Sequence, residues 1–155
     1  MIEFSIKDQF GREYTEESWP DSVVVLFGSD KGGSEFNEPW AKAIQDSLKD
    51  QEGYEDLRIV AVADLRGVPF FIKPIVKAMF PDEKELWILL DWGGEFAKSY
   101  SFEKDRSNIL VFDRRSHLRY QTSVAEFDST ALPALLGEIR GALQERPPLS
   151  DQTAE

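Results

Sequence analysis

The amino-acid sequence predicts an α/β protein with a mixed central sheet, helices on both faces and an N-terminal β-hairpin. Strand-like and helix-like segments alternate through the middle of the chain, which implies parallel pairing there. Residues 23–27 are continuously apolar and mostly β-branched, as in a strand that is covered on both faces. A second hairpin late in the chain would add an antiparallel edge to the sheet.

The N-terminal hairpin is predicted from a two-residue period. Ile2, Phe4 and Ile6 alternate with polar residues, which is typical of a half-buried strand. Residues 8–11 then indicate a turn, and residues 12–14 a short return strand.

The first long helix is expected to begin near Ser34, which is a good N-cap residue. Apolar residues from Phe36 to Leu48 then recur at helical spacing. Pro39 falls inside this pattern and should kink the helix, because proline lacks a backbone donor.

The remaining elements follow from the same rules of periodicity and punctuation. Strands are expected at 57–63, 86–90, 109–112 and 117–121. Helices are expected from Pro69 or Pro74 to Phe80, over 95–100, and over 130–145 with Asp128 or Ser129 as the cap. We predict one domain over residues 1–146 and a disordered polar tail over 147–155.

The charge balance excludes some classes of partner. The chain has 29 acidic and 18 basic residues and a net charge of −11, so nucleic acid and anionic membranes are disfavoured. No apolar run is long enough to span a membrane, and the first residues lack the pattern of a signal peptide. We expect a cytoplasmic protein, or a periplasmic one if a leader peptide has been removed. The absence of cysteine fits either compartment.

The order and spacing of these segments over residues 2–143 resemble the peroxiredoxin and thiol-disulfide-interchange branch of the thioredoxin-like superfamily. The similar pieces are the turn after Ile6, the proline five residues after Ser34, the segments 89–91 and 97–102, and the strand 109–113. The resemblance implies a thioredoxin-like fold. It also implies a dithiol at the turn before the first long helix. Cysteine-free relatives of this branch occur among bacterial proteins.

The chain departs from that branch at the residues that carry its chemistry. The four positions of the dithiol motif are Lys31, Gly32, Gly33 and Ser34. The position of the branch's cis-proline falls at about Ser107. Neither a hydroxyl nor an ammonium group can form the thiolate that exchange requires, so thiol–disulfide exchange and peroxidase activity are excluded.

Two groups of residues are candidate sites. The turn of residues 31–34, with Ser107, could present backbone donors to a carboxylate or another anion, or it could be a loop that keeps an inherited shape. Asp30, Asp64 and Asp91 each end a predicted strand. They could hold Mg²⁺ or Ca²⁺, although aspartate is common at such ends because it accepts local backbone hydrogen bonds.

Three other features favour structural interpretations. His117, beside Ser116, is expected on the surface of a hairpin, because a hydrolase triad would need a nucleophile that the sequence does not indicate. The pair Arg114–Arg115 is expected to be a solvated turn. The apolar run 68–72, with Trp92 and Phe96, could be a recognition patch, but we expect it to belong to the core.

The preferred hypothesis is a non-catalytic binding or interaction module that recognises an unidentified protein or a small acidic ligand, with no cofactor. The first alternative is a metal-dependent enzyme that uses Asp30, Asp64 and Asp91. The second is a redox protein whose cysteines have been replaced, which the Lys-Gly-Gly-Ser turn does not favour.

Overall fold

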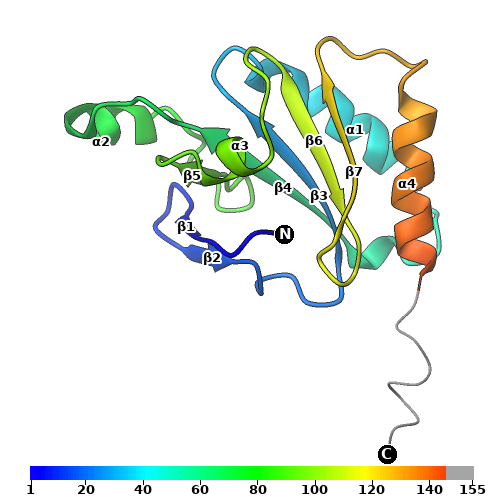
Figure 1. The fold of residues 1–155 in the computed structure, drawn as a ribbon. Coiled ribbons are helices and arrows are strands. Elements are labelled where there is room, and N and C mark those ends of the chain that lie inside the picture. The colour runs from blue at the N-terminus through cyan, green and yellow to red at the C-terminus, as the bar shows by residue number, and fades with distance from the viewer. Residues whose placement is uncertain (146–155) are drawn as a thin grey trace, which may run out of the picture.

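The computed structural model describes residues 1–145 of the 155-residue chain and contains a five-stranded mixed sheet. The strand order is β5-β4-β3-β6-β7 (Figure 1). Its strands are β3 (Val23–Ser29), β4 (Leu57–Asp64), β5 (Leu89–Asp91), β6 (Ser107–Phe112) and β7 (Leu118–Val124). The strands β3, β4 and β5 are parallel, and β6 and β7 run antiparallel to their neighbours. The prediction of a parallel middle with an antiparallel hairpin edge is therefore confirmed.

Strand β3 lies at the centre of the sheet, as its unbroken apolar sequence predicted. All seven of its residues are buried. Val25 is opposite Ile59 on β4 and opposite Val111 on β6. A strand that is paired on both edges and covered on both faces leaves no position for a charged side chain.

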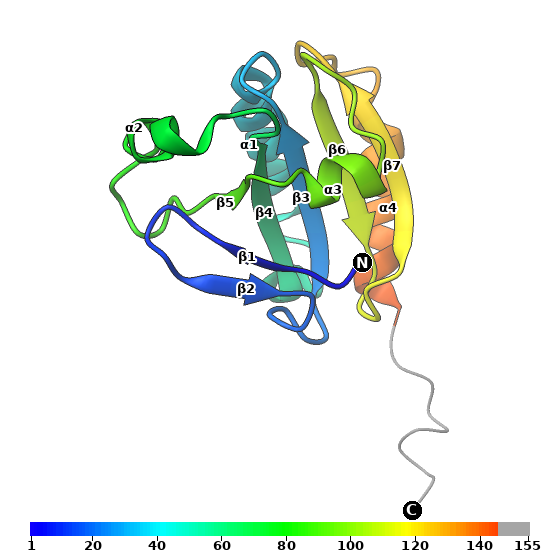
Figure 2. The ribbon, with the colours of Figure 1, turned by 60° about the vertical axis from the view of Figure 1, so that its left-hand side comes forward.

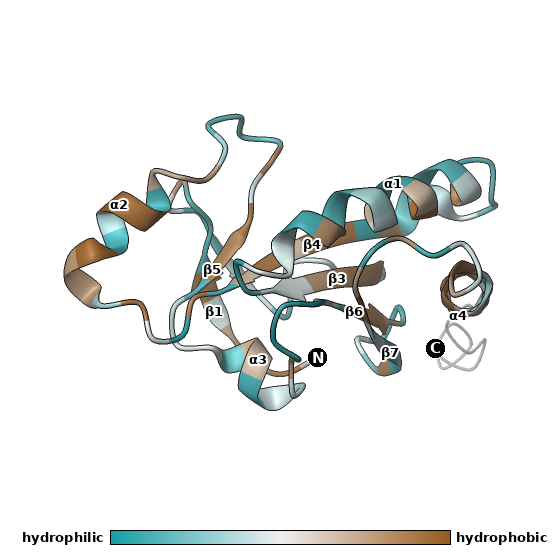
Figure 3. Cartoon of the chain, turned by 90° about the horizontal axis from the view of Figure 1, so that it is seen from above, coloured by the Kyte–Doolittle hydropathy of each residue, from teal (hydrophilic) through white to brown (hydrophobic). Residues whose placement is uncertain are grey.

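One face of the sheet is covered by α1 (Asn37–Leu48) and α4 (Leu132–Gln144). Their apolar stripes meet the inward side chains of β3 and β6 in one buried cluster. Figure 3 shows the two helices and the sheet from above. The largest contributions come from Phe27, Trp40, Ile44, Leu48, Ile109, Leu135 and Ile139.

The other face is covered by the N-terminal hairpin, β1 (Ser5–Lys7) and β2 (Glu13–Thr15), and by α3 (Glu95–Ser99) (Figure 2). Phe4, Ile6 and Phe96 bury their side chains against the sheet here. The predicted N-terminal hairpin is confirmed, with Ile6 paired to Tyr14.

The helix α2 (Lys73–Lys77), preceded by a 3-10 turn at Phe70–Ile72, lies apart from these layers. Figures 1 and 3 show it beyond β5, on the opposite side of the molecule from α4. We refer to residues 68–86 as the α2 arm. The expectation that the run 68–72, together with Trp92 and Phe96, belongs to the core is wrong for Phe70 and Phe71, which are exposed. It is right for Phe96, which is buried.

Several helix ends differ from the predictions because the expected capping side chains form other hydrogen bonds or do not contact the helix. Ser34 does not cap α1; its hydroxyl donates to the Lys31 carbonyl, and a 3-10 turn at Ser34–Phe36 precedes the helix. Pro39 is the third residue of α1, within the first turn, where proline is tolerated. Neither Asp128 nor Ser129 caps α4, whose N-cap is Ala131. The tail predicted over 147–155 lies outside the described residues.

Candidate functional site

The turn of residues 31–34 follows the end of β3 and leads into the 3-10 turn before α1. It is packed against the loop of residues 103–106, which precedes β6. The Cα atom of Gly33 lies so close to this loop that a Cβ atom there would be 2.0 Å from the Arg106 carbonyl oxygen. A Cβ atom on Gly32 would meet the Asp105 carboxylate at the same distance. Gly33 is therefore required by the close approach of the two backbones, whereas the Asp105 side chain could move away from a substituted Gly32.

Asp30 joins the same two loops. Its carboxylate accepts hydrogen bonds from the Gly33 N–H at 2.9 Å and from the Asp105 N–H at 3.1 Å. Its carbonyl oxygen accepts the Ser34 N–H at 3.0 Å. Two donors that sequence reasoning offered to a ligand, those of Gly33 and Ser34, are therefore already used by Asp30.

Ser107 is the first residue of β6 and is fully buried. Its hydroxyl donates to the Asn37 side-chain oxygen at 2.6 Å, and the Asn37 amide donates to the Ser29 hydroxyl at 3.0 Å. This chain of polar groups fastens the start of α1 to β3 and β6. Ser107 is thus a buried structural residue of the site. The residues that are exposed at the surface of the site are Lys31, Gly32 and Ser34.

The loop 103–106 is fixed by Asn108, a buried residue that the sequence analysis did not single out. Its amide donates to the carbonyls of Gly28 and Glu103, and its side-chain oxygen accepts the Glu103 N–H at 2.9 Å. The sequence offers one indication of this role: an asparagine at the start of a predicted buried strand needs hydrogen-bond partners, which are often backbone groups of a neighbouring loop. The loop also contains an exposed cation, Lys104, next to Asp105, which contacts the turn.

The three strand-end aspartates do not form a metal site. Asp64 pairs with Arg66 at 2.9 Å, while Asp30 is held by the two loops described above. The Asp91 carboxylate accepts the N–H groups of Glu95 and Phe96 at the start of α3. Within residues 1–145, no three histidine, cysteine or acidic side chains come together as a ligand group. The metal-enzyme alternative therefore has no support in the described part of the chain.

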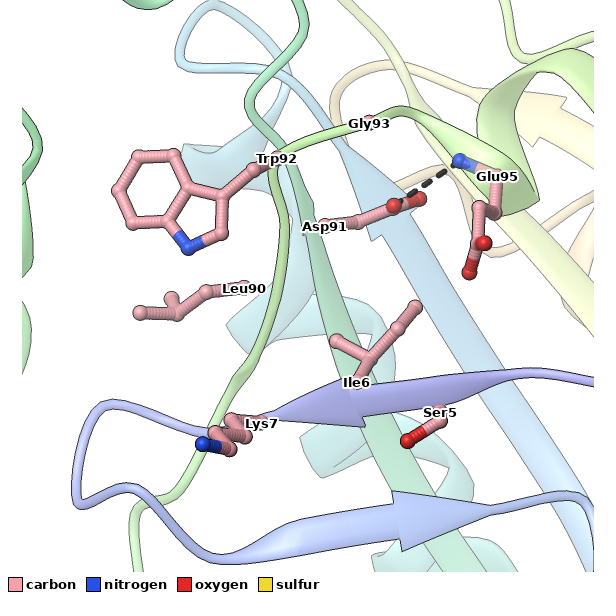
Figure 4. A pocket seen from close by; sticks show the side chains of 8 residues that line it. All are labelled: Ser5, Ile6, Lys7, Leu90, Asp91, Trp92, Gly93 and Glu95. Atoms are coloured by element: carbon pink, nitrogen blue, oxygen red, sulfur yellow. Dashed lines mark hydrogen bonds between the residues drawn. The ribbon is translucent and has the colours of Figure 1, made fainter. Parts of the chain in front are cut away.

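Asp91 also borders a pocket of about 340 Å³ between β1 and the turn that joins β5 to α3 (Figure 4). Burial raises the pKa of Asp91, the charge of Asp64 adds to this rise, and backbone hydrogen bonds oppose it. Figure 4 shows the carboxylate directed to the Glu95 N–H. Asp91 therefore serves to start α3, and the pocket wall is completed by Lys7, Leu90 and Trp92.

The two features of the C-terminal hairpin differ in their placement. His117 is exposed as expected, near the Asp113 carboxylate at 3.8 Å. Arg114 is not a solvated turn residue: its guanidinium is largely buried and donates to Asp56 and to the carbonyls of Asp21 and Leu143. It ties the hairpin to α4.

Comparison with solved structures gives matches that span nearly the whole chain. The exposed lipoprotein thioredoxin Etrx1 from Streptococcus pneumoniae matches with a TM-score of 0.61 and 17% identity, over 88% of this chain and 99% of that one. An uncharacterized thioredoxin-like protein from Porphyromonas gingivalis matches with a TM-score of 0.62 and 17% identity, over 96% and 94%. The fold is thioredoxin-like. A secreted disulfide oxidoreductase from Mycobacterium tuberculosis, homologous to DsbE of E. coli, agrees, with a TM-score of 0.56 and 12% identity over 90% and 96%.

Other comparisons return nothing. No protein-family model matches the chain, and no curated protein matches it. The chain is thus a cysteine-free protein with a thioredoxin-like fold, in which thiol–disulfide exchange has no nucleophile. Within residues 1–145, no helix is both long and apolar enough to cross a bilayer.

Proposed function

We propose that this protein is a non-catalytic thioredoxin-like domain that binds a partner through the surface of Lys31, Gly32 and Ser34. One observation carries the proposal: the turn that would hold the dithiol keeps its place at the start of α1, but it is locked by Asp30 and carries no reactive group. A rigid turn loses little conformational entropy on binding, which favours recognition.

The partner we propose is a protein segment or small ligand that bears a carboxylate. Lys31 is exposed at the tip of the turn, and Lys104 lies in the loop packed against it. Neighbouring acids, among them Asp30, Glu35 and Asp105, disfavour a polyanion such as nucleic acid. A single carboxylate at Lys31 would make a charge-assisted hydrogen bond without meeting all of these acids.

The proposal is tested by site-specific photo-crosslinking in the native cell. A photoreactive amino acid at Ser34 should trap a defined partner, whereas the same group at Lys42, on the exposed side of α1, should not. With that partner purified, Lys31→Glu should weaken binding about tenfold or more, because it replaces a charge-assisted bond by repulsion. Equal trapping from both positions, or unchanged affinity of Lys31→Glu, would reject this surface.

For location, the cytoplasm stays our prediction. An extracytoplasmic site is the alternative that two of the similar structures support, because one is named an exposed lipoprotein and the other a secreted oxidoreductase.

A further inference from the structure

The α2 arm exposes more large apolar side chains than any other segment among residues 1–145. Phe70 is 79% exposed, Phe71 71%, Met79 69% and Ile75 66%, and Leu86 at the other end of the arm is 53% exposed. Figure 3 shows hydrophobic colouring on α2, which projects beyond the sheet. Large apolar side chains that are exposed together on one segment often mark an interaction site.

The arm is held rigidly at its base. The Gln9 amide donates to the Leu86 carbonyl at 2.8 Å and to that of Pro81 at 3.2 Å, and the Gln9 side-chain oxygen accepts the Ile88 N–H at 2.8 Å. Arg12 donates to the Lys84 carbonyl at 2.8 Å. At the other end, the Lys73 ammonium lies 5.0 Å from the centre of the Trp92 ring. The apolar side chains are thus presented by a fixed scaffold, which lowers the entropy cost of covering them.

The charges of the arm are separated along its length. Its first half, residues 68–80, carries Lys73 and Lys77 and no acid, while its second half carries Asp82, Glu83 and Glu85 beside Lys84. Apolar side chains occur in both halves. A two-fold contact in which the two arms run antiparallel brings the first half of one arm to the second half of the other. Such a contact matches basic with acidic groups twice.

We propose that the α2 arm is a self-association surface, which pairs antiparallel with the α2 arm of a second copy of this chain around a two-fold axis. Phe70, Phe71, Ile75, Met79 and Leu86 would form the apolar centre of the contact. Lys73 and Lys77 would face the acids at 82–85 of the second copy. This surface is distinct from the turn of residues 31–34.

The charge pattern favours a second copy over a lipid surface. Three basic and three acidic residues leave the arm without net charge, while the whole chain carries −11. An anionic bilayer would therefore repel the protein and gain nothing from the arm.

The test uses two charge variants of the full chain in sedimentation equilibrium. The acidic-arm variant is Lys73→Glu/Lys77→Glu, and the basic-arm variant is Asp82→Lys/Glu83→Lys/Glu85→Lys. The wild type should approach twice 17.7 kDa as its concentration rises. Each variant alone should dissociate at least about tenfold more readily, because like charges then meet in the contact. Mixed in equal amounts, the two variants should form a heterodimer, because their arms are now complementary.

Two controls keep the outcome clear. Lys42→Glu/Lys49→Glu, on α1 and at its C-cap, makes the same change in net charge as the acidic-arm variant and should leave the dimer intact. The thermal melt of the basic-arm variant should match the wild type, since Asp82, Glu83 and Glu85 are exposed. The acidic-arm variant should melt only slightly lower, because it loses the contact of Lys73 with Trp92 but no core side chain. A wild type that stays monomeric at every concentration, or variants that do not pair when mixed, would overturn the proposal. Binding of the monomer to phosphatidylcholine vesicles, lost in Phe71→Ser, would assign the arm to a lipid surface instead.

Discussion

The turn of residues 31–34 and the α2 arm contrast in how their surfaces are completed. The turn occupies the place where the resemblance in sequence implies a dithiol, yet its backbone donates hydrogen bonds to Asp30 and is packed against the loop 103–106. The arm includes the run 68–72, which the sequence analysis assigned to the core in preference to a recognition patch, yet it leaves Phe70, Phe71 and Met79 exposed. Residues within the chain satisfy backbone donors of the turn. The apolar side chains of the α2 arm, in contrast, are not covered by any segment within residues 1–145.

This contrast indicates that the rigidity of a turn and the presence of a reactive group are separate properties. A turn without thiols can still be kept rigid by its neighbours, because packing and backbone hydrogen bonds do not depend on the reactive atoms. Exposed apolar area is a more direct indication of a binding surface than a rigid turn, because apolar area is costly to leave in water.

The largest effect that separates the two regions is expected from Gly33→Ala. The added Cβ would lie 2.0 Å from the Arg106 carbonyl oxygen, and backbone on both sides leaves no room to relax. We expect a loss of about 3 kcal/mol in the free energy of unfolding, measured by urea denaturation. Gly93→Ala is the matched control, since a Cβ atom added there would have no neighbouring atom within 4 Å. Equal stability of both variants would mean that the turn is not pressed against the loop.

Asp8→Asn should destabilise the support of the α2 arm by about 2 kcal/mol at neutral pH. The Asp8 carboxylate accepts hydrogen bonds from Phe10, Arg12 and Tyr14, and Arg12 in turn holds Lys84. An asparagine would place its amide against the Arg12 guanidinium. Urea denaturation at pH 7, with the exposed Asp50→Asn as control, measures the difference.

The same variant has a defined pH dependence. Burial alone would raise the pKa of Asp8, but the hydrogen bonds from Arg12, Phe10 and Tyr14 outweigh burial, so the pKa is lowered. An acid with a lowered pKa in the folded state contributes stability above its unfolded pKa and loses it as the pH falls through the folded value. The gap between wild type and Asp8→Asn should therefore narrow below about pH 4. A gap that widens there would contradict the assignment.

Asp30→Asn should have a smaller effect, about 1 kcal/mol, because one side-chain oxygen can still accept the Gly33 and Asp105 N–H groups. Thermal denaturation should show a lower melting temperature for this variant. Asp46→Asn removes a solvent-exposed partner of Lys42 at 3.4 Å and should be close to neutral. If the two variants melt together, Asp30 does not lock the turn.

The sheet could be predicted from sequence because its signals are local and strong. The apolar run of β3, the alternation before β1 and the helical spacing in α4 each describe how a segment meets the core, and all three predictions are confirmed. Helix caps were predicted less well. Ser34 and Asp128 are good capping residues in isolation, but each bonds instead to its own turn.

The candidate site was only partly accessible to sequence reasoning. Position 107 could be located by counting along the chain, but not the burial of Ser107 or its bond to Asn37, which depend on how α1 docks on the sheet. The exposure of Phe70 and Phe71 was missed for the same kind of reason. An apolar run has one pattern whether it faces a core or a second molecule, so composition alone assigns it to the core.

The smallest effect is expected where the sequence suggested a core. Phe71→Ser, studied at a concentration low enough to keep the protein monomeric, should change the free energy of unfolding by less than about 0.5 kcal/mol, since an exposed side chain loses little on truncation. Phe96→Ser, the matched control on the buried face, should cost several kcal/mol, on the order of 3–5, because it leaves a cavity and buries a hydroxyl. Both are measured by urea denaturation, with identical slopes expected for wild type and Phe71→Ser. A large loss in Phe71→Ser under these conditions would mean that the arm folds back onto the body of the protein, and the contrast between the turn and the arm would then disappear.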